Sequence, residues 1–479
     1  MSVLSSVLFF CLATACLVFF LSHLYRTWNS LSLVGKGQEE SRINQPLLRF
    51  KNVFYWGAGQ RRMFKDILPA VMHFFIFWGF VVVSVGTIET MIHGVFHSFD
   101  FRFLLGQGAL WKTYLFSQDS ANFLVLLAVA YAILRRLFFP PPRLTKLSSS
   151  SKKDAYYILL FIFGLVASSL VVMGGMTHVD SQGLLPATVI PFSALFASFF
   201  GSVFSFSTAS QWTLFNEISW WIHVTIFLSF MVYLPFSKHQ HFIWVWPNMF
   251  FKSIKSTGRL RPMEFDEEAE SFGVGDVSGF TWKQLLDGIT CVECGRCTSV
   301  CPASATEKPL DPKLIIHDLK VALQDASKHP KTEDRKTLIG DIVSKEELWA
   351  CTTCGACMEA CPLHIEHIPA IVDMRRYMTM TEGEVPEELQ TTLNNLENQS
   401  NPWGFSNDQR EDWTKDLDVA KMREDADVEY LFWVGCAGSF DQRYKKVSQS
   451  LVKILKEAGI KFAILGKEEK CNGDTARRA

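Results

Sequence analysis

Residues 291–302 read C-V-E-C-G-R-C-T-S-V-C-P, and residues 351–362 read C-T-T-C-G-A-C-M-E-A-C-P. Each stretch has four cysteines and a proline at the spacing C-x2-C-x2-C-x3-C-P. With this spacing, three thiolates of a run hold one face of a [4Fe–4S] cube, and the fourth cysteine ligates the other cube. A pair of zinc sites leaves the repeated proline unexplained, and disulfides are rare in cytosolic domains. The spacing therefore predicts two [4Fe–4S] clusters.

The same spacing assigns four ligands to each cluster. Cluster one takes Cys291, Cys294, Cys297 and Cys361. Cluster two takes Cys351, Cys354, Cys357 and Cys301. Gly295 and Gly355 fall inside the two ligand turns, where a residue without Cβ lets the backbone wrap closely around an inorganic core.

Composition divides the chain of 479 residues into two unlike halves. The length suggests about three domains. Phenylalanine and tryptophan crowd the first half and charged residues fill the second, which predicts a membrane half joined to a soluble half. The formal net charge of −1 gives no argument for nucleic-acid binding. Ten of the 12 cysteines follow residue 290, and we expect the other two, Cys11 and Cys16, to be structural.

Five apolar runs are each about long enough to cross a hydrocarbon core of roughly 30 Å. They are 3–24, 69–92, 119–138, 154–177 and 218–237. Lysine and arginine concentrate in 26–65, in 135–153 and after Lys238, and residues 176–217 contain neither. Placing every basic segment in the cytoplasm requires five spans with the N-terminus outside. Residues 178–216, which contain a sixth apolar run at 184–205, then form an external or re-entrant segment.

The first span has no basic leader and no small-x-small cleavage site, so we expect a retained helix rather than a signal peptide. The predicted location is the cytoplasmic (inner) membrane, with several spans in the bilayer and the cluster domains in the cytoplasm.

Histidines stand at both ends of two of these spans. His73 and His93 lie about 30 Å apart on the second span, and His223 and His241 lie about 27 Å apart at the fifth, at about 1.5 Å per helical residue. Two antiparallel helices with matching pairs can hold two b-type haems. We pair His73 with His241 on the inside and His93 with His223 on the outside.

The alternative is that these histidines form interhelical hydrogen bonds or reach the headgroups. His97 is a rival to His93, and His239 is a rival to His241. Glu89, one turn before His93, is expected to orient that imidazole. Glu89 and Asp119 are also candidates beside a quinone pocket.

Five spans with two histidines on the second and two on the fifth resemble the haem b subunit of respiratory nitrate reductase. The sequences W-W-I-H at 220–223 and P-F-S-K-H-Q-H at 235–241 resemble the last helix of that subunit in related fused proteins. The histidine spacing on the second span is longer here.

The remaining boundaries follow from changes in composition. After the haem b domain (1–242) we expect an interfacial linker at 243–275, where tryptophans precede basic residues. A ferredoxin-like domain occupies 276–378, with helices at 312–326, 333–348 and 366–378. Its helix-rich insert is typical of the heterodisulfide reductase and succinate dehydrogenase type. Residues 379–427 are expected to be mainly linker.

Residues 428–479 form a further region. An apolar strand ends in Gly435 and Cys436, a helix follows near 441–458, and a strand K-F-A-I-L precedes C-N-G-D-T-A-R-R at 471–478. This order resembles the first part of the cysteine-rich CCG domain of heterodisulfide reductases. Cys436 and Cys471 are candidate ligands of a further iron–sulfur cluster, although Asn472 replaces the adjacent cysteine. The chain ends within the motif, so we expect a fragment of a longer protein.

Together, these parts resemble the membrane-bound iron–sulfur oxidoreductases related to heterodisulfide reductase. The resemblance implies an enzyme that passes electrons from electron-transfer flavoprotein through two clusters and two b haems to menaquinone. The expected fold is multidomain: a five-span α-helical haem b domain, an α-helical two-cluster domain and a partial α/β cysteine-rich domain. Two alternatives remain: a quinol-linked heterodisulfide or thiol–disulfide reductase, and a structural anchor without haem.

Overall fold

A computed structural model describes residues 3–34, 41–96, 99, 101–106, 108–145, 147–181, 195–203, 208–256, 258–263, 265, 271–329, 331–424 and 427–479. Contacts divide the chain into two compact units. Unit 1 comprises Met1–Pro262 and Asp276–Ile371, and unit 2 comprises Met263–Gly275 and Val372–Ala479. The membrane helices and the cysteine runs therefore belong to one unit. The finer domain boundaries expected from the sequence stay predictions.

Unit 1 contains five long helices: α1 (Val3–Val34), α3 (Ile67–Val95), α5 (Ala109–Phe138), α7 (Ser149–Ser181) and α9 (Ala209–Tyr233). Each is long and apolar enough to cross a membrane. The five predicted spans are thus confirmed, and each helix is longer than its apolar run, although α9 ends at Tyr233, before the predicted end at 237.

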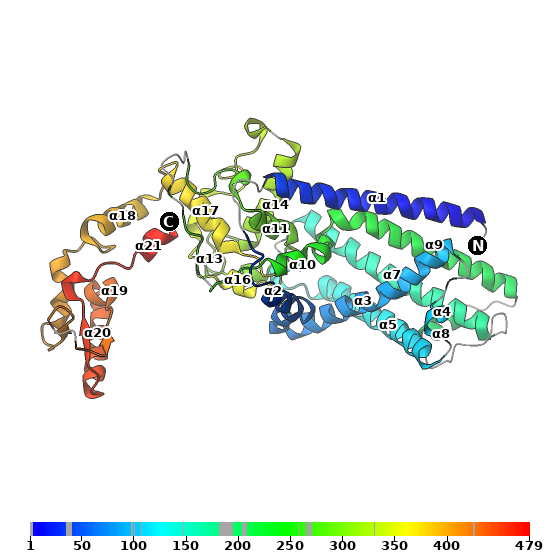
Figure 1. The fold of residues 1–479 in the computed structure, drawn as a ribbon, viewed down its shortest axis with the longest axis horizontal. Coiled ribbons are helices and arrows are strands. Elements are labelled where there is room, and N and C mark those ends of the chain that lie inside the picture. Colours follow the sequence, from blue (N-terminus) through cyan, green and yellow to red (C-terminus); the bar gives the residue numbers. More distant parts are fainter. Residues whose placement is uncertain are drawn as a thin grey trace. The chain divides into compact units, whose positions relative to one another are not determined.

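The five helices lie side by side in one bundle (Figure 1). Helix α3 packs on α5, α5 on α7 and α7 on α9, while α1 contacts both α3 and α9. Gly79 lets α3 approach α5 closely, since a Cβ there would lie 2.2 Å from Cγ2 of Val125. Small residues at such crossings are typical of membrane bundles.

The sixth apolar run contributes a short helix, α8 (Leu195–Ser202), which packs on α5 and α7. Asp119 of α5 accepts hydrogen bonds from the backbone N–H groups of Phe196 and Ala197, at 2.9 and 2.8 Å. Eight residues are too few to cross a bilayer. Residues 182–194 and 204–207 of the expected re-entrant segment lie outside the described residues.

The cluster region packs against one end of the bundle, which we name the cluster end (Figure 1). Its helices are α11 (Trp282–Thr290), α12 (Arg296–Ser299), α13 (Pro302–Ala305), α14 (Pro312–Lys328), α15 (Lys345–Ala350), α16 (Ala356–Ala360) and α17 (His367–Met380). The helix expected at 333–348 is wrong apart from its end. Gly340, at φ +118°, turns the chain so that its N–H donates to the carbonyl of Val343.

Unit 2 has a three-stranded parallel sheet in the order β1 (Ala420–Lys421), β3 (Phe462–Ile464), β2 (Tyr430–Leu431). Helix α20 (Gln442–Glu457) connects β2 to β3, and Val452 on its buried face meets Trp413, Phe462 and Ile464. The predicted strand–helix–strand order is present, but β2 ends at Leu431. Gly435 and Cys436, expected to end the strand, begin α19 (Gly435–Phe440) instead. Residues 379–427, expected to be mainly linker, contain α18 (Glu387–Gln399), η9 (Asn407–Thr414) and β1.

Short elements complete the described chain. They are α2 (Pro46–Asn52), η2 (Val53–Ala58), η3 (Arg61–Lys65), α4 (Arg102–Leu105), α6 (Pro142–Thr145), η5 (Leu234–Phe236), η6 (Lys238–Gln240), α10 (His241–Phe250), η7 (Val277–Gly279), η8 (Thr332–Asp334), α19 (Gly435–Phe440), η10 (Gly466–Glu468) and α21 (Asp474–Arg478).

Candidate cofactor sites

The structure gathers the eight cysteines of the two runs into two groups. Cys361 lies beside the first run, close enough to interact electrostatically with Cys291, Cys294 and Cys297. Cys301 lies with the second run, and the four thiols of that group line a small cavity: Cys301, Cys351, Cys354 and Cys357. Each run therefore sends its fourth cysteine to the other group.

The two ligand turns have the same backbone conformation. Gly295 and Gly355 have φ values of +71° and +78°, and each precedes a short helix. In the first turn the N–H of Glu293 donates to Sγ of Cys291 at 3.4 Å, and in the second the N–H of Thr353 donates to Sγ of Cys351 at 3.3 Å. The paired turns thus direct equivalent N–H groups at equivalent sulfurs.

Four of these eight cysteines are buried: Cys297, Cys301, Cys357 and Cys361. Burial, more than the neighbouring thiols, raises the pKa of Cys361 to about 12 and that of Cys357 to about 12. Iron binds thiolates, so cluster assembly must release these protons.

An apolar cavity of about 620 Å³ lies among the long helices of the bundle. Most of its lining is aliphatic or aromatic, and four histidines also line it: His73, His223, His239 and His241. Its volume is within the range of cofactor pockets. The cavity thus collects three of the four predicted haem ligands and the rival His239.

Hydrogen bonds to Nδ1 orient three of these imidazoles. His73 Nδ1 lies 2.9 Å from Oε1 of Gln60, and His241 Nδ1 lies 3.0 Å from the carbonyl of Lys238. His223 Nδ1 lies 2.9 Å from Oγ of Ser168, whose own hydroxyl donates to the carbonyl of Leu165. Because all three partners accept, Nδ1 carries the proton and Nε2 keeps its lone pair, as a metal-ligating histidine requires.

His239 differs from His241 in its surroundings. Its ring packs against Phe230, Phe242 and His241, at centroid distances of 5.5, 6.4 and 5.3 Å. These ring contacts indicate that His239 packs as part of the aromatic wall of the cavity. The oriented imidazole of His241 has the arrangement of a ligand.

The cavity lining does not include His93. His93 Nδ1 lies 3.2 Å from the carbonyl of Phe99, at the other end of α3. Its rival, His97, lies outside the described residues. The structure therefore does not bring His93 to the cavity that His223 lines.

Glu89 and Asp119, two of the carboxylates in the long helices, hold backbone segments. Glu89 accepts hydrogen bonds from the N–H of Phe101 at 2.7 Å and from the hydroxyl of Tyr114 at 2.5 Å. It thus joins the segment after α3 to α5, while Asp119 holds the start of α8. Neither contact supplies a quinone pocket.

At the cluster end, the cavity wall is completed by the cluster region itself. Glu293, Cys294 and Arg296 come from the first ligand turn, and Pro362 and Leu363 follow Cys361. A cofactor held by His73 and His241 would therefore adjoin the cluster-one cysteines. Cys354 of the other group is exposed.

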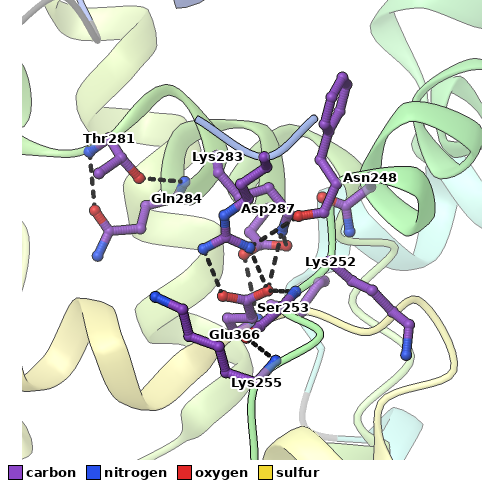
Figure 2. A network of polar contacts seen from close by, with 12 residues as sticks. Asn248, Lys252, Ser253, Lys255, Thr281, Lys283, Gln284, Asp287 and Glu366 are labelled. Atoms are coloured by element: carbon purple, nitrogen blue, oxygen red, sulfur yellow. Dashed lines mark hydrogen bonds and ion pairs between the residues drawn. The ribbon is translucent and has the colours of Figure 1, made fainter. Parts of the chain in front are cut away.

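A buried carboxylate joins the cluster region to the bundle. Glu366 accepts two hydrogen bonds from Arg42, at 2.7 and 2.9 Å, and one from the N–H of Ser253 at 2.7 Å. Figure 2 shows Glu366 between Ser253 and the pair formed by Lys283 and Asp287, which lie 2.7 Å apart. Burial by itself raises the pKa of Glu366, but Lys283 and Arg42 lower it to about 2.

We expect Glu366→Gln to destabilise the protein by roughly 3–5 kcal/mol, because Arg42 and Lys283 would lose a buried charged partner. The depressed pKa means that this contribution is present above pH 4.5, the ordinary value, and is lost as the pH falls toward about 2. Thermal unfolding of the purified protein at pH 7 and at about pH 3 measures both effects, and the acid loss should be smaller in the variant.

Glu359→Gln is the matched control. Glu359 also joins the cluster region to the bundle, through Lys65 at 2.8 Å, but its side chain is 62% exposed. We expect this exposed pair to contribute about 1 kcal/mol or less. Equal destabilisation by the two variants would contradict the role given to burial.

The cysteines of unit 2 also lie together. Cys436 interacts with Cys471, and its Sγ lies 3.6 Å from Nη2 of Arg410. Burial raises the pKa of Cys436 although Arg410 opposes the shift. Asn472, at the position of the missing cysteine, accepts a hydrogen bond from the N–H of Asp474 at 3.1 Å. The site thus offers two thiols among the described residues.

Sequence reasoning missed the residues that orient the others. Gln60 and Ser168 support histidines, Glu366 joins the cluster region to the bundle, and Arg410 contacts Cys436. Each lies far along the chain from the residue that it contacts, or belongs to no short motif. Gln60 and Ser168 can be identified only from the hydrogen bonds that they make to histidine Nδ1 atoms, and those bonds are visible only in the folded structure.

Comparison with known proteins agrees with this division of sites. Residues 288–365 match the 4Fe-4S dicluster domain, and residues 430–479 match the family described as "Cysteine-rich domain". The chain is 34% identical to "Probable iron-sulfur-binding oxidoreductase FadF" of Bacillus subtilis (strain 168), over 99% of this chain and 71% of that protein. The chain belongs to the iron–sulfur oxidoreductases related to heterodisulfide reductase.

Other members of this family are also similar. "EtfAB:quinone oxidoreductase" of Syntrophomonas wolfei subsp. wolfei is 33% identical over 95% of this chain and 67% of that protein. A component of the dihydromethanophenazine:CoB–CoM heterodisulfide reductase of Methanosarcina mazei is 28% identical over 42% of this chain and 50% of that protein. No solved structure matches the chain. As a member of the family, the protein is an iron–sulfur oxidoreductase, and its five apolar helices indicate a multi-pass membrane protein.

Proposed function

We propose that this protein passes electrons from a soluble electron-transfer flavoprotein, through two [4Fe–4S] clusters and b-type haem, to menaquinone in the cytoplasmic membrane. The observation that carries the proposal is the cavity at the cluster end. It is lined both by the oriented imidazoles of His73 and His241 and by Cys294 of the first cysteine group. The name of the Syntrophomonas relative, an EtfAB:quinone oxidoreductase, supports the same donor and acceptor classes.

The residues fit a b-type haem. The cavity is apolar, as a porphyrin requires, and His73 and His241 both leave Nε2 available. Haem supplies one-electron chemistry when it is bound. The chain orients the ligands, excludes water with aliphatic and aromatic walls, and places the cluster-one thiols beside the cavity.

The proposed order of the cofactors follows from exposure. Cys354 of the second group is exposed, whereas Cys294 of the first group lines the membrane cavity. Electrons would enter at cluster two, continue to cluster one, and leave toward His73 and His241. The cluster regions would then face the cytoplasm and the N-terminus the outside, as the basic segments suggest.

The second haem of the proposal has less support. His223 lines the cavity and is oriented by Ser168, whereas the lining does not include His93. A haem at this position would therefore need His223 as one ligand and, as the second, a residue other than His93 in its present position.

Visible and electron paramagnetic resonance spectra of the purified protein test the proposal. We expect haem b bands and two cluster signals, and we expect reduced electron-transfer flavoprotein to reduce both within one turnover of quinone reduction. Cluster signals without haem absorbance would end the proposal. The same result would follow if the flavoprotein reduced neither cofactor.

A quinol-linked heterodisulfide or thiol–disulfide reductase is the second candidate. The contact between Cys436 and Cys471 and the likeness to the Methanosarcina heterodisulfide reductase favour it. Asn472 opposes it, because its side chain caps a turn where the related motif has a second thiol. Disulfide turnover driven by quinol would establish this candidate.

A further inference from the structure

Arginines gather at the cluster end of the cavity, whose other walls are mostly apolar. Lys238 and Glu293 also line this end, and they pair with each other at 3.4 Å. Arg135 and Arg136 come from the last turns of α5, Arg143 comes from α6, and Arg296 comes from the first ligand turn. Arg296 is close enough to Arg135 and Arg143 for their charges to interact. These four guanidiniums, which we call the arginine set, thus come from three separate segments.

Protein groups balance only part of this charge. Arg143 pairs with Asp66 at 3.1 Å, and Arg296 lies beside the thiol of Cys294, where cluster one would bring further negative charge. Within the described part of the chain, no carboxylate lies within ion-pair distance of Arg135 or Arg136. Two adjacent cations of α5 therefore remain at the mouth of the cavity.

Such an arrangement is unfavourable in the absence of an anion. Like charges repel more strongly where apolar walls reduce the effective dielectric constant than they do in water. A guanidinium is also suited to a carboxylate, because its planar fork can make two parallel hydrogen bonds. The set thus indicates an anion that shares the cavity with an apolar group.

We propose that Arg135 and Arg136 bind the propionate carboxylates of the haem held by His73 and His241. The inference rests on the proposed function, because it requires that haem. A b-type haem is an apolar macrocycle with two carboxylates on one edge, and the cavity combines apolar walls with a basic end. Arg296 interacts electrostatically with His73, so the arginine set and this ligand pair lie at the same end.

The anion could also be the phosphate of a lipid headgroup, since α5 ends near the membrane surface. Both anions have the same chemistry toward arginine. They differ in what changes when the arginines are removed. Loss of a propionate contact alters the haem, whereas loss of a phosphate contact alters the lipid that accompanies the protein.

The test compares R135Q, R136Q and the double variant with wild type. Haem content, the propionate bending band in resonance Raman spectra and the haem midpoint potential are measured, together with the phospholipid that co-purifies. Removing positive charge disfavours the reduced haem. We expect the reduction equilibrium of the double variant to shift about tenfold toward oxidised haem, which is about 59 mV for one electron. The propionate band should shift as well.

K153Q is the charge control. Lys153 is an exposed cation at the start of α7 and does not line the cavity, so neither the band nor the potential should change. If the glutamine variants fail to retain haem, the double variant R135K/R136K tests the inference instead. Lysine keeps the positive charge but lacks the planar guanidinium that can make two parallel hydrogen bonds. That variant should keep the haem, and its propionate band should shift.

An unchanged band and potential in the haem-containing double variant would overturn the inference. Loss of a bound anionic phospholipid with the haem unchanged would overturn it in favour of the headgroup. Wild-type protein without haem would instead remove the proposed function, and the inference with it. If only the inference about the arginines is wrong, the wild-type protein still shows its haem spectrum. If the proposed function is wrong, it does not.

Discussion

His73→Ala is expected to remove the haem at the cluster end and to lower flavoprotein-dependent quinone reduction by more than about 100-fold. Loss of a residue that merely supports a metal ligand costs 10–100-fold, so loss of a ligand should cost more. His73 lies at the junction between the cavity and the cluster-one cysteines, and no other described imidazole on α3 lines that cavity. Haem absorbance and steady-state quinone reduction measure the two effects.

The clusters should persist in this variant, since their thiols lie outside the membrane helices. Electron paramagnetic resonance of the reduced protein would show both cluster signals and no haem at this position. His241→Ala should behave in the same way.

His239→Ala is the matched control, because His239 lines the same cavity but packs as an aromatic wall. It should retain the haem with a small change of spectrum. If His239→Ala removed the haem and His241→Ala did not, the ligand assignment would be reversed.

Cys361→Ala is expected to eliminate cluster one although Cys361 belongs to the second cysteine run. The structure places its thiol beside Cys294 and Cys297 of the first run. Non-haem iron should fall by about half, because one of two cubes is lost. Quinone reduction should fall to background, since the proposed path to the cavity passes through that cluster. Iron analysis and the signals of the reduced clusters measure the change.

The reciprocal variant sharpens this prediction. Cys301→Ala, in the first run, should eliminate cluster two and leave cluster one. Cys11→Ala serves as a control, because Cys11 is exposed on α1, far along the chain from either run. If Cys361→Ala and Cys351→Ala gave the same residual cluster, each run would hold its own cube and the crossed ligand sets would be wrong.

Local patterns predicted much of the fold. A cysteine spacing brings three thiols to one turn by itself, and Gly295 and Gly355 supply the left-handed backbone that the turn needs. Apolar length predicted the five spans, because a helix in lipid must satisfy its own backbone and cover about 30 Å. The helix at 333–348 failed because Gly340 reverses the chain within an otherwise helical composition.

Contacts between segments far apart in the chain could not be predicted from these local patterns. Gln60 lies before η3 and supports His73 of α3, while Ser168 of α7 supports His223 of α9. The choice between His239 and His241 depends on a single carbonyl, that of Lys238, which lies within reach of one ring nitrogen. Two histidines separated by one residue have nearly the same sequence context, so only the folded chain distinguishes them.

The sequence by itself determined which chemical groups this protein has: two cysteine runs at cluster spacing, five apolar spans and histidines at their ends. These features are local, because the spacing along one turn or one helix sets them. The tertiary structure decided which groups meet. It placed Cys294, His73 and His241 around one cavity, left His93 out of its lining, and gathered arginines at its mouth. Those choices depend on how helices pack, and packing is a property of surfaces formed by residues far apart in the chain.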